Sequence, residues 1–547
     1  MNLRRTLLRP VAHLAGLHAS GQGRAFLRSH QRTQRQQDEL LESMIRAFRD
    51  TDFGRDHGFD RIRGYDDLVR AVPVATYERF APYIDKVLAG RTTALLPPGQ
   101  KLLMFSLTSG TTGKPKHIPV TGQFADDMRR GWNVFGIRLL HDHPASWLRP
   151  ILQISSPMRE SVSPGGLPCG AVSGLLAVTQ KSIVRRMYVV PPEVAYIGDA
   201  TSRYYVTLRC GVGRDVAFIT TANPSSTIRL IEVGQEYASR LIRDVADGTC
   251  TPPAPIDPAI ARVLRFKPNP RLARRMADGL ARDGRLLPRH FWDIDFLANW
   301  TGGTLELYLA PLREMFDGVP VRDIGLLASE GRFSVPIEDN RPYGIADITS
   351  NFLEFIPSDR RGDANPPTLR ADEVEIGRDY YLVFSNPTGL WRYNLDDCVK
   401  VVGFYGQTPI IEFLHRGKHT ANITGEKITE HQVVEAMRQA AARLNLRVER
   451  FTLQGHFAQE PYYLLAMDEI DQGVAAALAE TMDTSLSEIN MEYQSKRKTS
   501  RLGPIRISLL PAGSMAAAER SQIANRHGRA EQYKHQYLLT DVVKDNG

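Results

Sequence analysis

Residues 108–116 form the stretch of this sequence with the clearest capacity for chemistry. They read Thr-Ser-Gly-Thr-Thr-Gly-Lys-Pro-Lys, with four hydroxyl side chains, two glycines and two lysines. Backbone N–H groups beside glycine, hydroxyl donors and ammonium groups can together surround the oxygens of a polyphosphate. We therefore predict a phosphate site whose contacts are Ser109, Gly110, Thr111, Thr112, Gly113 and Lys116.

This loop differs from the Walker A loop of P-loop proteins. That motif has the pattern GxxxxGK[ST], whereas Lys114 is followed here by Pro115. A proline at this position also stops a helix from starting directly after the loop. An ordinary polar turn is the alternative interpretation, but it explains a run of nine such residues poorly.

Further short motifs follow the loop along the chain. Each is a weak signal alone, but chance does not readily account for all of them in this order. They are Thr301-Gly302-Gly303, Ser329-Glu330 after a predicted strand, Asp397 at the end of residues 391–397, Arg416-Gly417, Gly425-Glu426-Lys427, and Lys534.

The loop and these motifs resemble the signature of the adenylate-forming enzymes. Three variants are similar to the plant auxin- and jasmonate-conjugating acyl-acid amido synthetases and their bacterial relatives: Ala328-Ser329-Glu330, Trp391-Arg392-Tyr393 and Gln532-Tyr533-Lys534. The resemblance covers about residues 40–540. It implies an α/β fold with a large multi-subdomain N-terminal adenylate-forming domain and a smaller α+β C-terminal domain.

The resemblance also implies a ligase that uses ATP and Mg²⁺ to adenylate a carboxylic acid. The acyl group would then pass to an amine, expected to be an amino acid. Lys116 and the loop would hold the β- and γ-phosphates, Glu330 would bind Mg²⁺, and Asp397 would bind the ribose. The other implied roles are adenylate contacts for Gly302, Gly303, Ser329 and Phe352, a hinge at Arg416, and α-phosphate contacts for the catalytic lysines Lys427 and Lys534. A place in the core is an equal alternative for Phe352.

Two positions depart from the family pattern. Asp396 stands where the family has a glycine before the ribose aspartate, and Gln536 where a proline follows the late lysine. We expect Asp396 to reshape the ribose contact or add negative charge, and Gln536 to loosen the loop that holds Lys534. Neither change removes a reacting group.

Two other functions are compatible with the sequence. An acyl-CoA ligase would use a thiol as the acceptor, although we locate no basic patch for the 3′-phosphate of coenzyme A. A nucleotide- or acyl-binding protein that kept the fold without catalysis is the other alternative.

The secondary-structure pattern places these motifs among alternating helices and strands. Apolar spacing predicts a helix over residues 36–50, and short apolar runs predict strands over 151–154, 216–220, 321–328, 380–384, 399–405 and 410–414. Thr429 and Gln432 predict a capping box for a helix in a compact C-terminal unit. We predict a basic segment 1–37, a large ATP- and acyl-binding domain 38–415 and a mobile domain 416–547.

The formal net charge of +8 is concentrated at the N-terminus. Residues 1–37 contain seven arginines and no acidic residue, so the rest of the chain has 62 of the 69 basic side chains and all 61 acidic ones. This near-neutral body argues against nucleic-acid binding, and the run Lys496-Arg497-Lys498 is predicted to be a solvated loop. The Arg-rich start resembles a transit peptide, with a surface helix packed on the body as the favoured interpretation.

The four cysteines lie far apart and form no CxxC motif. This argues against a disulfide framework or structural zinc and favours a reducing compartment, which we take to be the cytoplasm. No apolar run approaches the roughly 18 residues that span a membrane, so we predict no membrane span.

Overall fold

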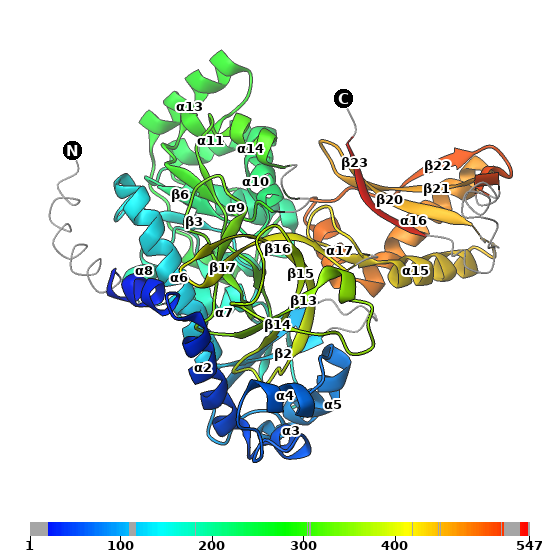
Figure 1. Ribbon diagram of the computed structural model, residues 1–547. Helices are drawn as coiled ribbons and strands as arrows, with labels where there is room; N and C mark the ends of the chain where they lie inside the picture. Colours follow the sequence, from blue (N-terminus) through cyan, green and yellow to red (C-terminus); the bar gives the residue numbers. More distant parts are fainter. Residues whose placement is uncertain are drawn as a thin grey trace. The chain divides into compact units, whose positions relative to one another are not determined.

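The computed structural model describes residues 20–108, 116–180, 182–302, 305, 308–417, 420–446, 448, 450–515, 517–518 and 537–544. The chain divides into two compact units (Figure 1). The first comprises Met1–Leu107 and His117–His415, and the second comprises Arg416–Gly547 with Thr108–Lys116.

The largest sheet of the first unit has seven strands in the order β11-β12-β17-β16-β15-β13-β14. Leu382 and Phe384, at alternate positions of β15, are buried with Phe48, Phe53 and Phe80 from the N-terminal helices. The strands are β11 (Ser334–Val335), β12 (Tyr343–Ala346), β13 (Phe352–Pro357), β14 (Leu369–Arg370), β15 (Asp379–Ser385), β16 (Tyr393–Tyr405) and β17 (Thr408–Arg416), and the helices are α2 (Thr33–Phe48), α3 (Asp52–Asp56), α4 (Tyr65–Ala71) and α5 (Tyr77–Leu88).

A second sheet of this unit is parallel, in the order β3-β6-β7-β8. Its strands are apolar because both faces are covered: Ile219 and Leu297 pack with Leu208 of α9 and Leu230 of α10, and Phe218 packs with α6. The elements are β3 (Ile151–Gln153), β6 (Phe218–Thr220), β7 (Phe296–Ala298), β8 (Val321–Arg322), α6 (Gly122–Asp142), α9 (Ala200–Gly211) and α10 (Pro224–Glu236).

The single strand predicted over residues 321–328 is interrupted. β8 ends at Arg322, and β9 (Leu327–Ala328) begins after a bend at Gly325, whose φ is 90°. A Cβ on Gly325 would lie 2.3 Å from Ser334 O, so glycine is required where the chain turns this closely against β11. β9 then pairs with β10 (Gly331–Arg332) as a hairpin.

The third sheet carries both ends of the predicted phosphate loop. β1 (Leu102–Thr108) and β2 (Lys116–Thr121) are neighbours in the order β2-β1-β5-β4, with β4 (Ser161–Val162) and β5 (Pro168–Gly170). Helix α6 follows β2 directly, and Thr121 caps it by accepting a hydrogen bond from the backbone N–H of Phe124.

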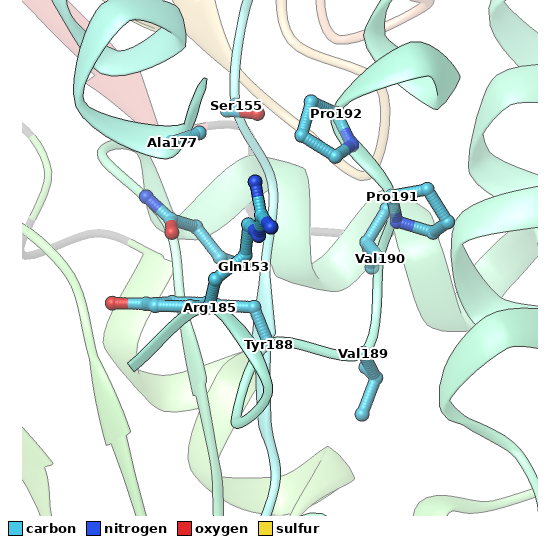
Figure 2. Close-up of a pocket in the computed structure, with 9 residues that line it drawn as sticks. All are labelled: Gln153, Ser155, Ala177, Arg185, Tyr188, Val189, Val190, Pro191 and Pro192. Atoms are coloured by element: carbon cyan, nitrogen blue, oxygen red, sulfur yellow. The ribbon is translucent and has the colours of Figure 1, made fainter. Parts of the chain in front are cut away.

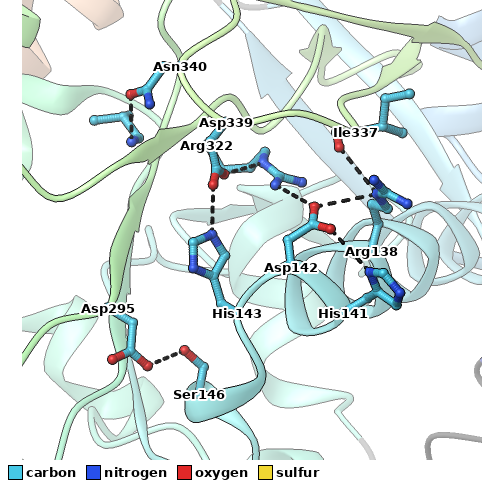
Figure 3. Close-up of polar contacts among 11 residues, drawn as sticks. Arg138, His141, Asp142, His143, Ser146, Asp295, Arg322, Ile337, Asp339 and Asn340 are labelled. Atoms are coloured by element: carbon cyan, nitrogen blue, oxygen red, sulfur yellow. Dashed lines mark hydrogen bonds and ion pairs between the residues drawn. The ribbon is translucent and has the colours of Figure 1, made fainter.

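A buried ion-pair cluster ties the end of α6 to β8 (Figure 3). Arg322 donates to Asp142 at 2.8 Å and to Asp339 at 2.6 Å, and His143 Nε2 lies 2.8 Å from Asp339. Because Arg322 is 1% exposed, its guanidinium needs the charge of these carboxylates. His141, near the end of the same helix, contacts Asp142.

The described part of the N-terminal segment packs on the first unit. Helix α2 crosses residue 37, where the sequence predicts a boundary. Gln37 is buried, donates to Ile348 O and Asn351 O, and accepts from Leu353 N. Helix α2 thus continues through residue 37, where buried hydrogen bonds anchor it, so the described part of the basic segment is continuous with the structure that follows.

The second unit is an α+β fold with a sheet in the order β22-β21-β20-β23. The capping box predicted at Thr429 and Gln432 is present at the start of α15. Met437, Leu478 and Met482 from the helices form one core with the sheet. The elements are α15 (Glu430–Arg443), α16 (Gln472–Ile489), α17 (Met491–Lys498), β18 (Thr420–Ala421), β19 (Ile428–Thr429), β20 (Phe451–Phe457), β21 (Tyr462–Asp468), β22 (Arg506–Leu510) and β23 (Leu538–Lys544).

The prediction of a solvated loop over residues 496–498 is wrong. These residues end α17, where Lys496 is buried and lies 3.3 Å from Glu492, and Arg497 pairs with Asp483 at 2.9 Å. The i, i+4 spacing on the helix brings Glu492 next to Lys496, so two of the three basic side chains that the sequence predicts to be solvated are paired with carboxylates.

Among the helices of the described residues, none has the length and apolar character to cross a bilayer.

Candidate active site

Part of the predicted site lies outside the described residues: Ser109, Gly110, Thr111, Thr112, Gly113, Gly303 and Lys534, together with the variant position Gln536. Lys116 begins β2, where the loop rejoins the sheet. The remaining predicted residues are carried by the hairpin, the sheets and the second unit.

Ser329 and Glu330 occupy the tip of the β9–β10 hairpin. The register pairs Ala328 with Gly331 and leaves these two residues as the connecting turn. Glu330 is 5% exposed, and no hydrogen bond or ion pair to its carboxylate occurs within the described part of the chain. Because a nearly buried carboxylate is costly without a partner, this side chain suits a cation.

Two asparagines fix the backbone of this hairpin. Asn386 Nδ2 donates to Glu330 O at 2.7 Å, and Asn351 Nδ2 donates to Arg332 O at 2.7 Å. Asn386 Nδ2 also donates to Asn351 Oδ1 at 3.3 Å, while its Oδ1 accepts from Thr388 N at 3.1 Å. Each side-chain amide therefore has only one orientation in which its donors and acceptors match those of its neighbours. These hydrogen bonds fix the backbone from which the Glu330 side chain extends.

The arginine of the hairpin anchors it from the other side. Arg332 is 2% exposed, donates to Ile324 O at 3.0 Å and lies 4.6 Å from the ring centroid of Trp132. Burial lowers the pKa of Arg332 to about 10. A Cβ at Gly131 would lie 2.4 Å from Arg332 Cδ, so this α6 glycine makes room for the side chain.

Tyr77 links Glu330 to the start of β2. Its hydroxyl accepts from the backbone N–H of His117 at 3.0 Å, next to Lys116. Burial raises the pKa of Tyr77, and nearby carboxylates, among them Glu330, add to the effect. The Tyr77 hydroxyl that contacts β2 at His117 is therefore also within electrostatic reach of Glu330.

The turn at Thr301-Gly302, which the sequence predicts to contact the adenylate, is joined through Asp323 to the bend before β9. Thr301 donates to Asp323 Oδ2 from both N and Oγ1 at 2.7 Å, and Gly325 N donates to Asp323 Oδ1 at 2.6 Å. Burial raises the pKa of Asp323. A Cβ on Gly302 would lie 3.1 Å from Phe413 O, which leaves little room for a side chain at this turn.

Asp397 stands in a bulge of β16. The register pairs Tyr381 with Cys398 and Val383 with Asn394, so three residues of β16 face one of β15. Asp396, in the bulge, has a φ of 63°, a left-handed conformation that glycine adopts without strain. This explains why glycine suits the position. Asp397 is 5% exposed.

The arginine of the same motif has a structural role. Arg392 Nε donates to both carboxylate oxygens of Glu354, at 3.0 and 3.1 Å, and Nη1 donates to Val72 O at 2.8 Å. Both charged side chains are at most 2% exposed. The pair joins α4 to the seven-stranded sheet.

Phe352 requires a correction. It is fully buried at the start of β13, its ring centroid lies 5.7 Å from that of Tyr65, and it belongs to the core with Phe48 and Trp391. A ring packed on all sides has no face for adenine. The core alternative describes this residue, because it occupies an inward position of a strand covered by helices.

Lys427 is presented by a tightly hydrogen-bonded loop in the second unit. Glu426 is fully buried and accepts from Ile423 N and Thr424 N at 2.7 Å and from the hydroxyl of Tyr463. Lys427 itself has a φ of 51°, and its charge helps to lower the pKa of Glu492, which burial alone would raise. Arg416 ends β17, and the next residue, Gly417, has a φ of 61°.

Four of these side chains carry no motif signal. Tyr77, Asp323, Asn351 and Asn386 support the site from four different elements, and each is an ordinary polar residue in its sequence context. Only the fold brings Asn386 to Glu330 O and Asn351 to Arg332 O.

The sequence matches the GH3 family N-terminal domain over residues 23–321, the central domain over 344–416 and the C-terminal domain over 431–542. The chain belongs to the GH3 family. Its similarity to curated members of the GH3 family is low but extends over most of each chain.

A jasmonoyl–L-amino acid synthetase of Nicotiana attenuata is 25% identical, covering 87% of this chain and 86% of the relative. A probable indole-3-acetic acid-amido synthetase of Oryza sativa subsp. japonica is 25% identical, covering 89% and 88%. The structure of the GH3.15 acyl acid amido synthetase in complex with 2,4-DB aligns with a TM-score of 0.65 and 21% identity, covering 95% and 94%. The chain therefore has the fold of a GH3 amido synthetase.

Proposed function

We propose that this GH3 protein is an ATP-dependent ligase that adenylates a carboxylic acid and transfers the acyl group to an amine, with an amino acid as the acceptor. Relatives named as amido synthetases align with most of its length. The observation that carries the proposal is Glu330, a nearly buried carboxylate on a hairpin that Asn386 and Asn351 hold in place.

The residues around Glu330 suit Mg²⁺. The described residues contain no group of three or more His, Cys, Asp or Glu side chains that could form a complete metal site. Mg²⁺ is usually bound through one or two carboxylates and completes its coordination with waters and substrate phosphates. Glu330 would hold this ion, which when bound neutralises charge on the phosphates.

In the first half-reaction a carboxylate oxygen of the acid attacks the α-phosphorus of ATP. A new P–O bond forms and pyrophosphate leaves. Both reactants are anionic, so the site must supply positive charge and donors, which we assign to Lys116, residues 109–113, Lys427 and Lys534. One well-placed donor is worth about 3–4 kcal/mol in a transition state. Asp397 would accept from the ribose hydroxyls, and Gly302 and Ser329 would line the adenylate.

In the second half-reaction the amine nitrogen attacks the acyl carbon. A C–N bond forms, the C–O bond to AMP breaks, and the amine gives up a proton. We assign the hinge between the two steps to Arg416, because Gly417 beside it adopts a left-handed conformation that glycine enters and leaves cheaply.

The test is acid-dependent ATP–pyrophosphate exchange with a panel of carboxylic acids, followed by mass spectrometry of products formed with mixed amino acids. We expect exchange and amide products in the wild type, and a near-complete loss of exchange in Glu330→Ala and Lys116→Ala. Glu375→Ala removes a carboxylate that is 68% exposed and serves as the control. Thioester without amide would indicate an acyl-CoA ligase, and the absence of exchange with every acid would indicate a binding protein.

A further inference from the structure

A pocket opens at the carboxyl end of β3 (Figure 2). It has about 530 Å³ of empty volume, part of it open to solvent. Ile151 N donates to Met187 O at 2.7 Å and Val189 N donates to Ile151 O at 3.0 Å, so residues 187–190 extend the parallel sheet beside β3. One wall of the pocket is therefore made of sheet backbone.

The lining combines an apolar wall with a few polar groups. Ala177 and residues 189–192 (Val-Val-Pro-Pro) form the apolar part, and the polar side chains are Gln153, Ser155, Arg185 and Tyr188. Among the described residues that line the pocket none is acidic, and the guanidinium of Arg185 is the one full charge. Figure 2 shows this guanidinium directed toward the space between Ser155, Ala177 and Pro192.

These polar groups are available to a ligand. Within the described part of the chain, the side chains of Gln153, Ser155 and Arg185 have no hydrogen bond or ion pair. Burial raises the pKa of Tyr188, so its phenol stays protonated and can donate. A guanidinium presents a planar fork of N–H donors that matches a carboxylate in two parallel bonds. The pocket therefore suits a carboxylate at the end of an apolar body.

The position of the pocket decides which carboxylate this is. The register of the parallel sheet places Gln153 beside Thr220 and Thr220 beside Ala298, the last residue of β7 before the adenylate turn. Two strand spacings, about 10 Å, therefore separate Gln153 from Ala298, which lies three residues before Thr301. Ligands of such sheets bind along this carboxyl edge. Residues 187–190 pair with β3 on the edge opposite β6, so β3 and β6 separate the segment that follows Arg185 from β7, the strand that leads to this turn.

We propose that this pocket binds the far end of the acid substrate and that this end carries a second carboxylate. The substrate class is then a dicarboxylic acid with an apolar spacer, whose near carboxylate is activated while Arg185 pairs with the distant one. This inference rests on the proposed function. The α-carboxylate of an amino-acid acceptor does not fit, because one carbon separates it from the attacking amine and it cannot reach across about 10 Å.

The first experiment measures binding without nucleotide. The full-length protein is titrated calorimetrically with adipate, suberate and sebacate, and with hexanoate, octanoate and decanoate as mono-acids of the same lengths. We expect one or more of the dicarboxylates to bind at least about tenfold more tightly than its mono-acid, because a charge-assisted pair is gained. Arg185→Ala should abolish this difference, Arg185→Lys should keep part of it, and Arg186→Ala should leave it unchanged, because this neighbouring arginine is exposed like Arg185 but does not line the pocket.

The second experiment measures ATP–pyrophosphate exchange with the same acids. We expect kcat/KM to favour a dicarboxylate in the wild type and the preference to disappear in Arg185→Ala, with little change for the mono-acid. Equal binding of each acid pair, or an Arg185→Ala variant that loses both acids alike, would overturn the pocket assignment. Selective binding of dicarboxylates without exchange on any acid would leave the pocket standing and contradict the proposed ligase function instead.

Discussion

Arg361 holds the side chain of Asp396 through two hydrogen bonds, with Nε 3.0 Å and Nη2 2.7 Å from Oδ1. The guanidinium also lies 4.7 Å from the ring centroid of Tyr381. The negative charge of Asp396 is thus paired next to Asp397. The bulge keeps its left-handed residue, and Asp396 tolerates that conformation better than most side chains do.

We predict that Asp396→Gly changes the unfolding free energy by less than about 1 kcal/mol. Glycine adopts the left-handed conformation without strain, and this gain offsets the loss of the partly exposed ion pair with Arg361 and the greater flexibility of glycine in the unfolded chain. Asp396→Val should destabilise by about 1–2 kcal/mol or more, because a β-branched residue is strained at this φ. Urea unfolding of both variants checks this. Equal stability of the two would show that the bulge does not demand a left-handed residue.

Replacement of Asn386 by Asp should impair catalysis. A carboxylate oxygen in place of Nδ2 would face Glu330 O and Asn351 Oδ1, and the repulsion should displace the hairpin. We expect exchange to fall by about 10–100-fold, as for other groups that orient a metal ligand, and the Mg²⁺ concentration for half-maximal rate to rise.

Asn269→Asp is the matched control, because at that helix cap the oxygen accepts from Leu272 N and the acid can do the same. Circular dichroism establishes that both variants are folded. An unaltered Mg²⁺ dependence in folded Asn386→Asp would refute the positioning role.

The buried pair of Arg392 and Glu354 should contribute to stability and not to chemistry. Glu354→Ala leaves a buried guanidinium without its carboxylate and should cost about 3–5 kcal/mol. The double variant Glu354→Leu/Arg392→Met should recover much of this loss. Glu488→Ala, which breaks the exposed pair with Arg443, should cost under about 1 kcal/mol. Denaturant unfolding gives all three values, and similar losses for Glu354→Ala and Glu488→Ala would contradict the assignment.

Asp127 should make the protein less stable as the pH rises toward neutrality. Burial raises the pKa of Asp127 to about 7, although Arg130 and Gln123 lower it in part and the charges of Asp347 and Asp126 add to the rise. The folded state then keeps its proton to higher pH than the unfolded chain, so the unfolding free energy falls between about pH 4 and pH 7.

Asp127→Asn should remove this dependence and stabilise the protein at about pH 8 by up to roughly 4 kcal/mol, with little effect near pH 4. Unfolding midpoints of both proteins across this pH range test the sign. A wild type that becomes more stable relative to Asp127→Asn as the pH rises would contradict it.

Sequence patterns predicted the local elements well where one face of an element is buried. The helix over residues 36–50, the strand over 380–384 and the capping box at Thr429 each correspond to an element of the structure. They failed where contacts made in the folded chain override the local pattern: Gly325 must turn against Ser334, and residues 496–498 find partners on their own helix and on α16.

The sequence by itself determined the α/β class, the family and the order of the motifs, because these depend on residue types and short spacings along the chain. Only the tertiary structure decided that Phe352 belongs to the core, that Arg392 is an ion-pair partner of Glu354, and that Asn386 supports Glu330. These roles depend on contacts between residues tens of positions apart. No local pattern encodes such contacts, because the packing of whole sheets and helices sets the distances.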